Sequence, residues 1–166
     1  MVMKKIISLM LCILTVAAFG GCGNDETSAQ KDVKADMFTL SQEMMKADET
    51  LPIMMIYTDK EDTDGGKLKN HCGLDKNKTN SYFFSCEESE NTHEISVIEM
   101  KSEGDVSLAQ EALKQHAEAL SKRFSSAPEK KARADKYVIT AKGRYTALII
   151  CDDPDSVKKV FEDSIK

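Results

Sequence analysis

Two pairs of predicted strands, each followed by an amphipathic helix, constrain the fold of this 166-residue chain most strongly. The β-rich runs SYFFSC (81–86) and HEISVIEMK (93–101) are separated by a polar segment, which indicates a hairpin. The segment KYVITAKGRYTALIICD (136–152) predicts two more strands around a turn at Lys142 and Gly143, where glycine can adopt the positive φ of a tight turn. Both faces of the second of these strands are apolar, so we expect it to be central in the sheet.

Three segments carry apolar residues at the spacing of an amphipathic helix. The longest is predicted over about residues 105–122, and another over about 32–47. A closing helix is expected after Asp153, which we place as the N-cap in front of Pro154 at the first helical position. The apolar face of the longest helix comprises Val106, Ala109, Leu113, Leu120 and Phe124.

The segments between these elements are shorter. The apolar run IMMIY (53–57) could be a strand or a packed loop, and we favour a strand. A short helix is expected from Lys67 to Gly73, where glycine provides a left-handed cap. Residues 59–66 are expected to form a solvated acidic loop, and residues 125–135 a polar connection with room for one helical turn. The elements together predict an α+β fold in one small domain, with an antiparallel sheet built from two hairpins and helices packed on it.

The first residues have the order of a secretory signal peptide. Lys4 and Lys5 precede an uncharged apolar run from Ile6 to Phe19, and small residues follow. This run is shorter than the roughly 20 residues that a helix needs to cross a bilayer. We therefore expect residues 1–21 to be a cleaved signal peptide and not a retained membrane anchor.

The cysteine that follows the small residues predicts how the protein is held. Gly20, Gly21 and Cys22 resemble the lipobox of bacterial lipoproteins. This resemblance implies that the Cys22 thiol receives a diacylglyceryl group and becomes the first residue after cleavage. Two acyl chains attach a protein stably, whereas one chain binds only marginally. We expect residues 22–31 to be a flexible tether and residues 32–166 to be the extracytoplasmic domain.

The net charge of the chain limits the kinds of molecule that it can bind. Removal of residues 1–21 takes away two lysines and no acidic residue, which leaves 21 basic and 28 acidic side chains and a net charge of −7. Nucleic-acid binding requires a basic surface that displaces counterions. The predicted partners are therefore the membrane, through the diacylglyceryl group on Cys22, and an envelope protein or peptide, with no nucleic acid.

The strand and helix order resembles a known family. GLD (73–75), the strand EISVIEMK (94–101), the long helix and KGRYTALIICDDPDSVKKVFEDSI (142–165) together resemble the small lipoproteins grouped as domain of unknown function 4358, found mostly in Gram-positive bacteria. The resemblance covers roughly residues 68–165 and implies a lipid-anchored, extracytoplasmic α+β domain. It implies no catalytic mechanism.

Cysteine and histidine are the candidates for chemistry. His71 and Cys72 are adjacent, and a thiol nucleophile needs a nearby base, yet no active-site signature surrounds Cys72. Cys72 could instead pair with Cys86 in a disulfide, which would leave Cys151 as a small buried residue on the predicted central strand. We therefore predict no catalytic residue.

Metal and cofactor sites are not expected from the spacing of the residues. The three histidines, His71, His93 and His116, are far apart in the sequence, and no cysteine pair has the close spacing of a zinc site. His116 lies near the apolar stripe of the long helix, where a core-edge role is the simpler interpretation. Asp62 and Asp64 suggest a calcium loop, but Lys60 stands where its first carboxylate should be. We predict no metal ligand and no cofactor.

Five methionines fall within twenty residues: Met37, Met44, Met45, Met54 and Met55. Methionine fills irregular cores and also forms adaptable binding surfaces. We expect core packing, with a hydrophobic partner groove as the alternative.

The sequence therefore predicts a non-enzymatic lipoprotein at the extracytoplasmic face of the cell membrane, which acts as a binding or accessory module. The alternative is a small envelope enzyme or accessory subunit that uses Cys72 or His71.

Overall fold

A computed structural model describes residues 36–86 and 92–166. The expected signal peptide, the lipidation site Cys22, the tether and the first residues of the predicted 32–47 helix lie outside the described residues. The elements in chain order are α1 (Met37–Lys46), β1 (Met55–Thr58), α2 (Gly66–Cys72), η1 (Lys76–Lys78), β2 (Thr79–Cys86), β3 (Glu94–Met100), η2 (Glu103–Asp105), α3 (Val106–Arg123), α4 (Pro128–Ala134), β4 (Val138–Lys142), β5 (Tyr145–Ile150) and α5 (Pro154–Ser164).

The described strands form one five-stranded antiparallel sheet in the order β1-β2-β3-β5-β4. The two predicted hairpins, β2–β3 and β4–β5, are confirmed, and they join through β3 and β5. All six residues of β5 are buried, as expected for a central strand. The run at 53–57 contributes β1 at one edge. The predicted α+β fold is therefore confirmed, with one strand added to the two hairpins.

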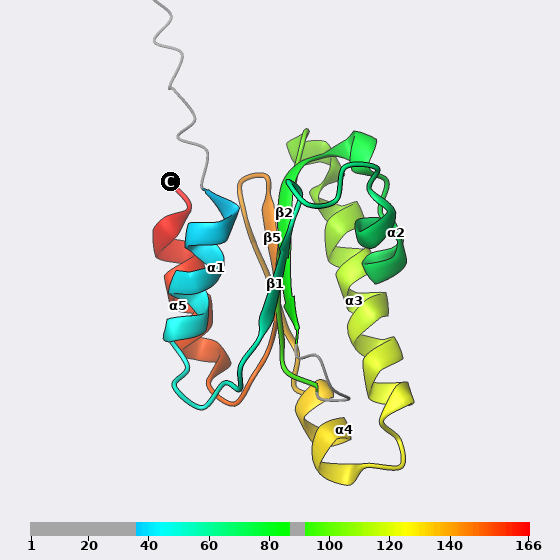
Figure 1. The fold of residues 1–166 in the computed structure, drawn as a ribbon, viewed down its shortest axis with the longest axis vertical. Coiled ribbons are helices and arrows are strands. Elements are labelled where there is room, and N and C mark those ends of the chain that lie inside the picture. The colour runs from blue at the N-terminus through cyan, green and yellow to red at the C-terminus, as the bar shows by residue number, and fades with distance from the viewer. Residues whose placement is uncertain (1–35, 87–91) are drawn as a thin grey trace, which may run out of the picture. The chain divides into compact units, whose positions relative to one another are not determined.

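Helices cover both faces of the sheet (Figure 1). The helices α1 and α5 pack on one face, where Leu40, Met44 and Phe161 meet sheet residues such as Ile95 and Ile149. The helices α2 and α3 pack on the other face. There the buried residues are Leu68, Leu74, Tyr82, Phe84, Ile98, Met100, Ala109, Leu113, Ala117, Leu148 and Ile150. Every strand position in the centre of the sheet is thus enclosed between two apolar layers.

The predicted cap of α5 and the cap of α2 at Gly73 are confirmed, whereas α1 begins at Met37, after its N-cap Asp36, and the second hairpin turns at Gly143 and Arg144 because Lys142 still pairs with Tyr145. Asp153 caps α5, since its Oδ1 accepts a hydrogen bond from the Ser156 N–H at 3.2 Å. Gly73 ends α2 with a φ of 78°, and Gly143 turns the β4–β5 hairpin with a φ of 53°. These conformations favour glycine because a side chain at positive φ is strained.

Two segments differ from expectation. The polar connection at 125–135 contains a full short helix, α4, with Pro128 in its first turn. The acidic loop at 59–66 is not solvated throughout, because Asp62 is buried. Its carboxylate accepts hydrogen bonds from the N–H groups of Lys67 and Leu68 and from the Tyr82 hydroxyl. Asp62 therefore anchors the start of α2 to the sheet.

The methionines divide between core and surface. Met37 and Met44 are buried between α1 and the sheet, as predicted. Met45, Met54 and Met55 are only partly buried. Within residues 36–86 and 92–166, none of the helices combines the length and the apolar character that crossing a membrane requires.

Candidate functional site: a buried histidine–glutamate cluster

Three titratable side chains that are far apart in the sequence meet beneath α3. His71 comes from the last turn of α2, Glu94 from the start of β3 and His116 from the middle of α3. Side chains alternate along a strand, so Glu94, Ser96 and the apolar residues after them at even positions share one face of β3. That face lies against α2 and α3, which brings Glu94 under both histidines.

The carboxylate of Glu94 is held by both imidazoles. His71 Nε2 lies 2.9 Å from Glu94 Oε1, and His116 Nε2 lies 2.7 Å from Glu94 Oε2. The Ser96 hydroxyl donates to Glu94 Oε1 at 2.7 Å and lies 3.3 Å from His71 Nε2. Only 4% of the Glu94 side chain is exposed, against 12% for His71 and 16% for His116. Each oxygen of the buried carboxylate therefore has an imidazole partner.

Further contacts fix the two rings. The His71 ring stacks on Phe84, with centroids 4.3 Å apart and an interplanar angle of 11°. The centroids of the His71 and His116 rings are 4.2 Å apart. The His116 side chain also forms a hydrogen bond to the backbone of His71. The rings consequently have defined orientations before any ligand binds.

The charges in the cluster stabilise one another. Burial raises the pKa of Glu94, but the charge and hydrogen bonds of His71 and His116 outweigh burial and hold that pKa well below its usual range. Burial also lowers the pKa of His116, and its hydrogen bond to Glu94 outweighs this and raises the pKa above its ordinary value. Glu94 is thus ionised at neutral pH, and His116 has an increased tendency to hold a proton.

The neighbouring thiols are not activated. Burial raises the pKa of Cys72 to about 11 and also raises that of Cys86. The thiol of Cys72 points at the carbonyl oxygen of Leu68, 3.6 Å away. Cys72 and Cys86 are free, so the disulfide considered from the sequence is not formed. Cys151 is free and buried, in agreement with the expectation of a small buried residue.

The structure brings only some of the residues considered from the sequence into the cluster. His71 is in the cluster, whereas His93 lies elsewhere, with its Nε2 3.7 Å from Asp152 Oδ2. Sequence reasoning missed Glu94 altogether and assigned His116 to the core edge. Two signals were present: Glu94 is a charged residue inside a β-rich run, and His116 follows Leu113 by three positions on the buried stripe of its helix. Neither signal indicated that the two side chains meet.

The cluster contains the donor types of a transition-metal site. One nitrogen from each histidine and one carboxylate oxygen of Glu94 lie within 4.8 Å of one another. Imidazole and carboxylate groups are ordinary ligands of zinc and related ions. The histidines are far apart in the sequence, but the rings of His71 and His116 are neighbours in the fold, so their sequence spacing does not exclude a shared metal ion.

Comparison with known proteins gives a family and no described activity. Neither the curated proteins nor the solved structures contain a match to this chain. A family model does match, and it covers residues 53–151, more than half of the chain. The match begins just before β1 and ends after β5, so it includes all five strands and the His71, Glu94 and His116 cluster, while α1 and α5 lie outside it. The chain therefore belongs to the family described as domain of unknown function DUF4358.

Proposed function

We propose that this protein is a lipid-anchored, non-catalytic binding module at the extracytoplasmic face of the cell membrane. The diacylglyceryl group on Cys22 holds it there. Its domain binds an extended apolar peptide segment of another envelope protein by adding that segment to the sheet beside β1. The anchor is inferred from the signal peptide and lipobox pattern, and the binding surface is inferred from the edge of the sheet.

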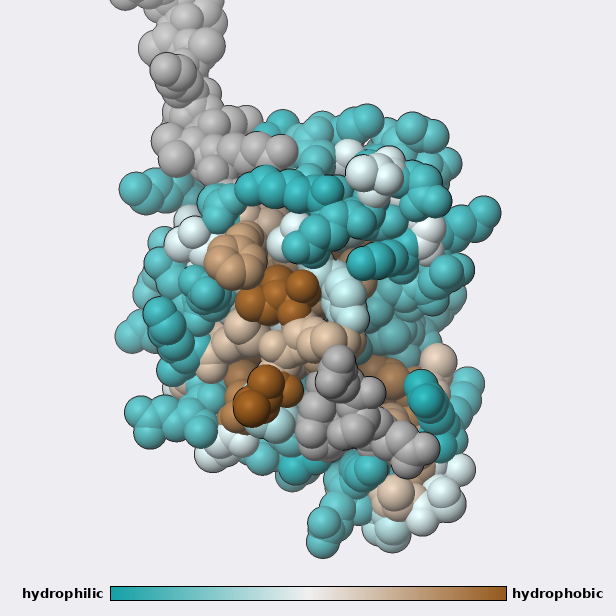
Figure 2. All heavy atoms as spheres, viewed as in Figure 1, coloured by the Kyte–Doolittle hydropathy of each residue, from teal (hydrophilic) through white to brown (hydrophobic). Residues whose placement is uncertain are grey.

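The observation that carries the proposal is the exposure of the segment LPIMMIY at residues 51–57. All of its residues are apolar or aromatic, and none is buried. Ile53 has 95% of its surface exposed. Figure 2 shows brown, hydrophobic side chains gathered on this face, over β1 and beside α1. A contiguous exposed apolar surface on a soluble domain commonly marks an interaction site.

The backbone of β1 is open to a further strand. Among the residues that the structure describes, β1 lies at the edge of the sheet and pairs with β2 on one side. The Asp59 N–H donates to the Tyr82 carbonyl at 3.0 Å, and residues alternate in direction along an antiparallel strand. The N–H and C=O groups of Ile56 therefore point away from β2. Such an edge accepts an extended peptide through main-chain hydrogen bonds.

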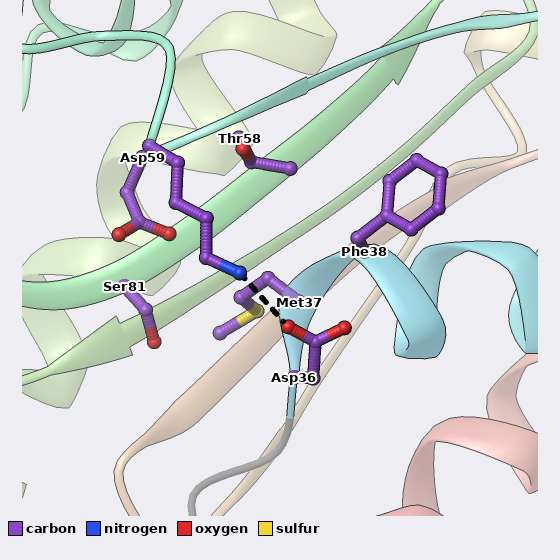
Figure 3. Close-up of a pocket in the computed structure, with 7 residues that line it drawn as sticks. Asp36, Met37, Phe38, Thr58, Asp59 and Ser81 are labelled. Atoms are coloured by element: carbon purple, nitrogen blue, oxygen red, sulfur yellow. Dashed lines mark hydrogen bonds and ion pairs between the residues drawn. The ribbon is translucent and has the colours of Figure 1, made fainter.

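Pockets beside β1 can receive the side chains of that peptide. One pocket of about 220 Å³ lies where the start of α1 meets the end of β1, and its lining includes Met37, Phe38 and Thr58 (Figure 3). Asp36 and Lys60 also line this pocket, and their side chains form an ion pair 3.1 Å apart. A second pocket of about 560 Å³ is lined by residues that include Met45 and Leu51. Backbone pairing combined with side-chain pockets is the usual basis of affinity and specificity in strand addition.

The alternative, an envelope enzyme that uses Cys72, is disfavoured by the state of its thiol. The thiolate is the nucleophilic form, and burial raises the pKa of Cys72 to about 11. The thiol is therefore protonated at neutral pH. His71 faces Glu94 Oε1, so it is not positioned as the base of a thiol pair.

Site-specific photocross-linking in intact cells tests the binding surface. A photoreactive amino acid at Ile53 is expected to capture an envelope protein, whereas the same group at Leu108 is not. Leu108 is a matched control because it is also apolar and 42% exposed, but it lies on α3 and not beside β1. Ile56→Pro, which removes an outward-facing N–H, should abolish capture without unpairing β1 from β2. Equal capture from both positions, or a cross-linked species that contains only a second copy of this chain, would contradict the proposal.

The anchor is tested separately. Cys22→Ser should release the protein from the membrane fraction or leave an uncleaved precursor, and the Ile53 cross-link should weaken accordingly. A normally processed, membrane-bound Cys22→Ser protein would refute lipidation at Cys22 and leave the edge-strand test unaffected.

A further inference from the structure

We propose that His71 Nε2, His116 Nε2 and the Glu94 carboxylate form a binding site for a divalent transition-metal ion of the Zn²⁺ class. The donors belong to α2, β3 and α3, and none of them belongs to the edge strand β1. It also departs from the prediction, made from sequence spacing, that the chain has no metal ligand.

The spacing of the donor atoms suits one ion. Zinc bonds to histidine nitrogen and carboxylate oxygen are about 2.0–2.2 Å long, which places tetrahedral ligand atoms about 3.4 Å apart. His71 Nε2 lies 2.9 Å from Glu94 Oε1 and His116 Nε2 lies 2.7 Å from Glu94 Oε2, and one ligand atom from each residue can be chosen so that all three lie within 4.8 Å of one another. Side-chain adjustments on the order of 1 Å would bring two nitrogens and one carboxylate oxygen around a single ion.

The surroundings of the donors resemble those of metal-binding histidines. A histidine ligand commonly forms a hydrogen bond from its other ring nitrogen to a carbonyl or carboxylate, which fixes the ring. The backbone of His71 interacts with the His116 side chain, and the His71 ring is stacked on Phe84. Ser96 donates to the Glu94 carboxylate. These contacts hold the three donor side chains, from α2, β3 and α3, beside one another.

The charge and accessibility of the cluster also suit an ion. The carboxylate supplies one negative charge inside the protein, and the ion would replace protons on the imidazoles. The two histidines retain some exposure, 12% and 16%, so an ion can reach the donors from the surface. Three protein ligands leave a fourth position for water or for a ligand group.

Titration of the full-length chain in detergent with Zn²⁺ and Co²⁺ tests the site. Calorimetry is expected to show one Zn²⁺ per chain, and Co²⁺ is expected to give the visible absorption of a four-coordinate site with no near-ultraviolet thiolate band. His116→Gln and Glu94→Gln should each weaken Zn²⁺ binding by at least about 100-fold, beyond the 10–100-fold typical for outer-shell changes. The matched control His93→Gln, which removes the histidine outside the cluster, should leave the affinity unchanged.

A measurement on the wild-type chain keeps the test decisive if a variant fails to fold. Zn²⁺ should shift the imidazole nuclear magnetic resonance signals of two of the three histidines and leave those of His93 in place. A Co²⁺ thiolate band, an equal loss of affinity in His93→Gln, or no shift at His71 and His116 at saturating Zn²⁺ would overturn the assignment.

Discussion

Strand β3 carries two buried glutamates on opposite faces, and their surroundings differ in chemistry. Glu94 faces α3 and meets His71, His116 and Ser96. Glu99 faces the α1 side, where Arg144, Asn80 and Ser81 donate to it at 3.1, 3.1 and 2.6 Å. Both residues are almost fully buried, with 3% and 1% of their surface exposed. Depth of burial therefore does not distinguish them.

The partners of the two glutamates differ in whether they can also bind a metal ion. The guanidinium of Arg144 has only N–H donors and does not deprotonate in proteins. An imidazole that loses its proton offers a lone pair to a metal ion. The Glu99 pair can therefore only hold the sheet and its turn together, whereas the Glu94 cluster can exchange protons for a cation. Four predictions sharpen or break this comparison, in order of decreasing effect.

Removal of the carboxylates should have unequal effects on stability. Glu94→Leu is expected to lower the free energy of unfolding by about 3 kcal/mol, because it leaves two largely buried imidazoles without an acceptor. Glu99→Leu should cost about 1–2 kcal/mol, because Arg144 is 29% exposed and can turn to solvent. Urea denaturation of both variants measures the difference. Equal losses in the free energy of unfolding would show that imidazole and guanidinium partners are equally costly to leave without a carboxylate.

Zinc should stabilise the protein through one glutamate only. At Zn²⁺ concentrations about 100 times the dissociation constant, the gain is about 2.7 kcal/mol, which raises the melting temperature on the order of 8 °C. Glu99→Gln should retain this gain and Glu94→Gln should lose it. Thermal unfolding followed by circular dichroism, with and without Zn²⁺, checks the prediction. A zinc-dependent rise that survives in Glu94→Gln would contradict it.

A third buried carboxylate, Asp62, extends the comparison to a group whose main donors are two backbone N–H groups and a phenol hydroxyl. Burial raises the pKa of Asp62, but hydrogen bonds from Tyr82, Leu68 and Lys67 outweigh it and lower that pKa from 3.8 to about 2. The folded pKa is below the unfolded one, so the ionised group stabilises the fold above about pH 4. This contribution, about 2 kcal/mol, is lost as the pH falls from about 4 to about 2.

The Asp62→Asn variant isolates that contribution from the other carboxylates. The stability gap between wild type and Asp62→Asn, measured by urea denaturation at several pH values, should be widest above pH 4 and shrink toward pH 2. A gap that stays constant over this range would mean that the neutral donors do not favour the ionised form.

The serine next to each glutamate provides the smallest and most closely matched test. Ser96→Ala and Ser81→Ala each remove one hydroxyl that donates to a buried carboxylate, at 2.7 and 2.6 Å. Each change should cost about 1.5 kcal/mol in the free energy of unfolding. Only Ser96→Ala should also weaken Zn²⁺ binding, by about 10-fold, because it alters the orientation of a ligand. A weakening of the same size in Ser81→Ala would remove the distinction between the two glutamates.

Local patterns predicted most of the fold. The hairpin around Gly143, the cap at Asp153 and the buried face of α3 follow from turn chemistry, capping and helical periodicity, which depend on neighbours in the chain. The sequence does not by itself distinguish the strand β1 from a packed loop, because a short apolar run fits both. The burial of Asp62 is not predictable from its neighbours in the loop. Its carboxylate accepts hydrogen bonds from the start of α2 and from Tyr82, which is twenty residues away.

Less of the candidate site than of the fold can be predicted from the sequence. His71 is a candidate base for the thiol of Cys72 because the two residues are adjacent in the sequence. In the structure, the partner of His71 is Glu94 and not the thiol. His116 falls on the buried stripe of α3, where periodicity alone favours a core-edge role. Zinc-site recognition from sequence depends on closely spaced ligands, and here the ligands come from α2, β3 and α3.

The sequence by itself determined the α+β class, the two hairpins and the helices, because hydrogen-bonding pattern and amphipathic period are local properties of the chain. Only the tertiary structure decided that Glu94 lies between His71 and His116, and that residues 51–57 remain partly exposed at the edge of the sheet. Those two features depend on which strands pair and which face each helix covers. Such choices minimise the exposed apolar surface of the whole domain, and no short segment of the sequence encodes them alone.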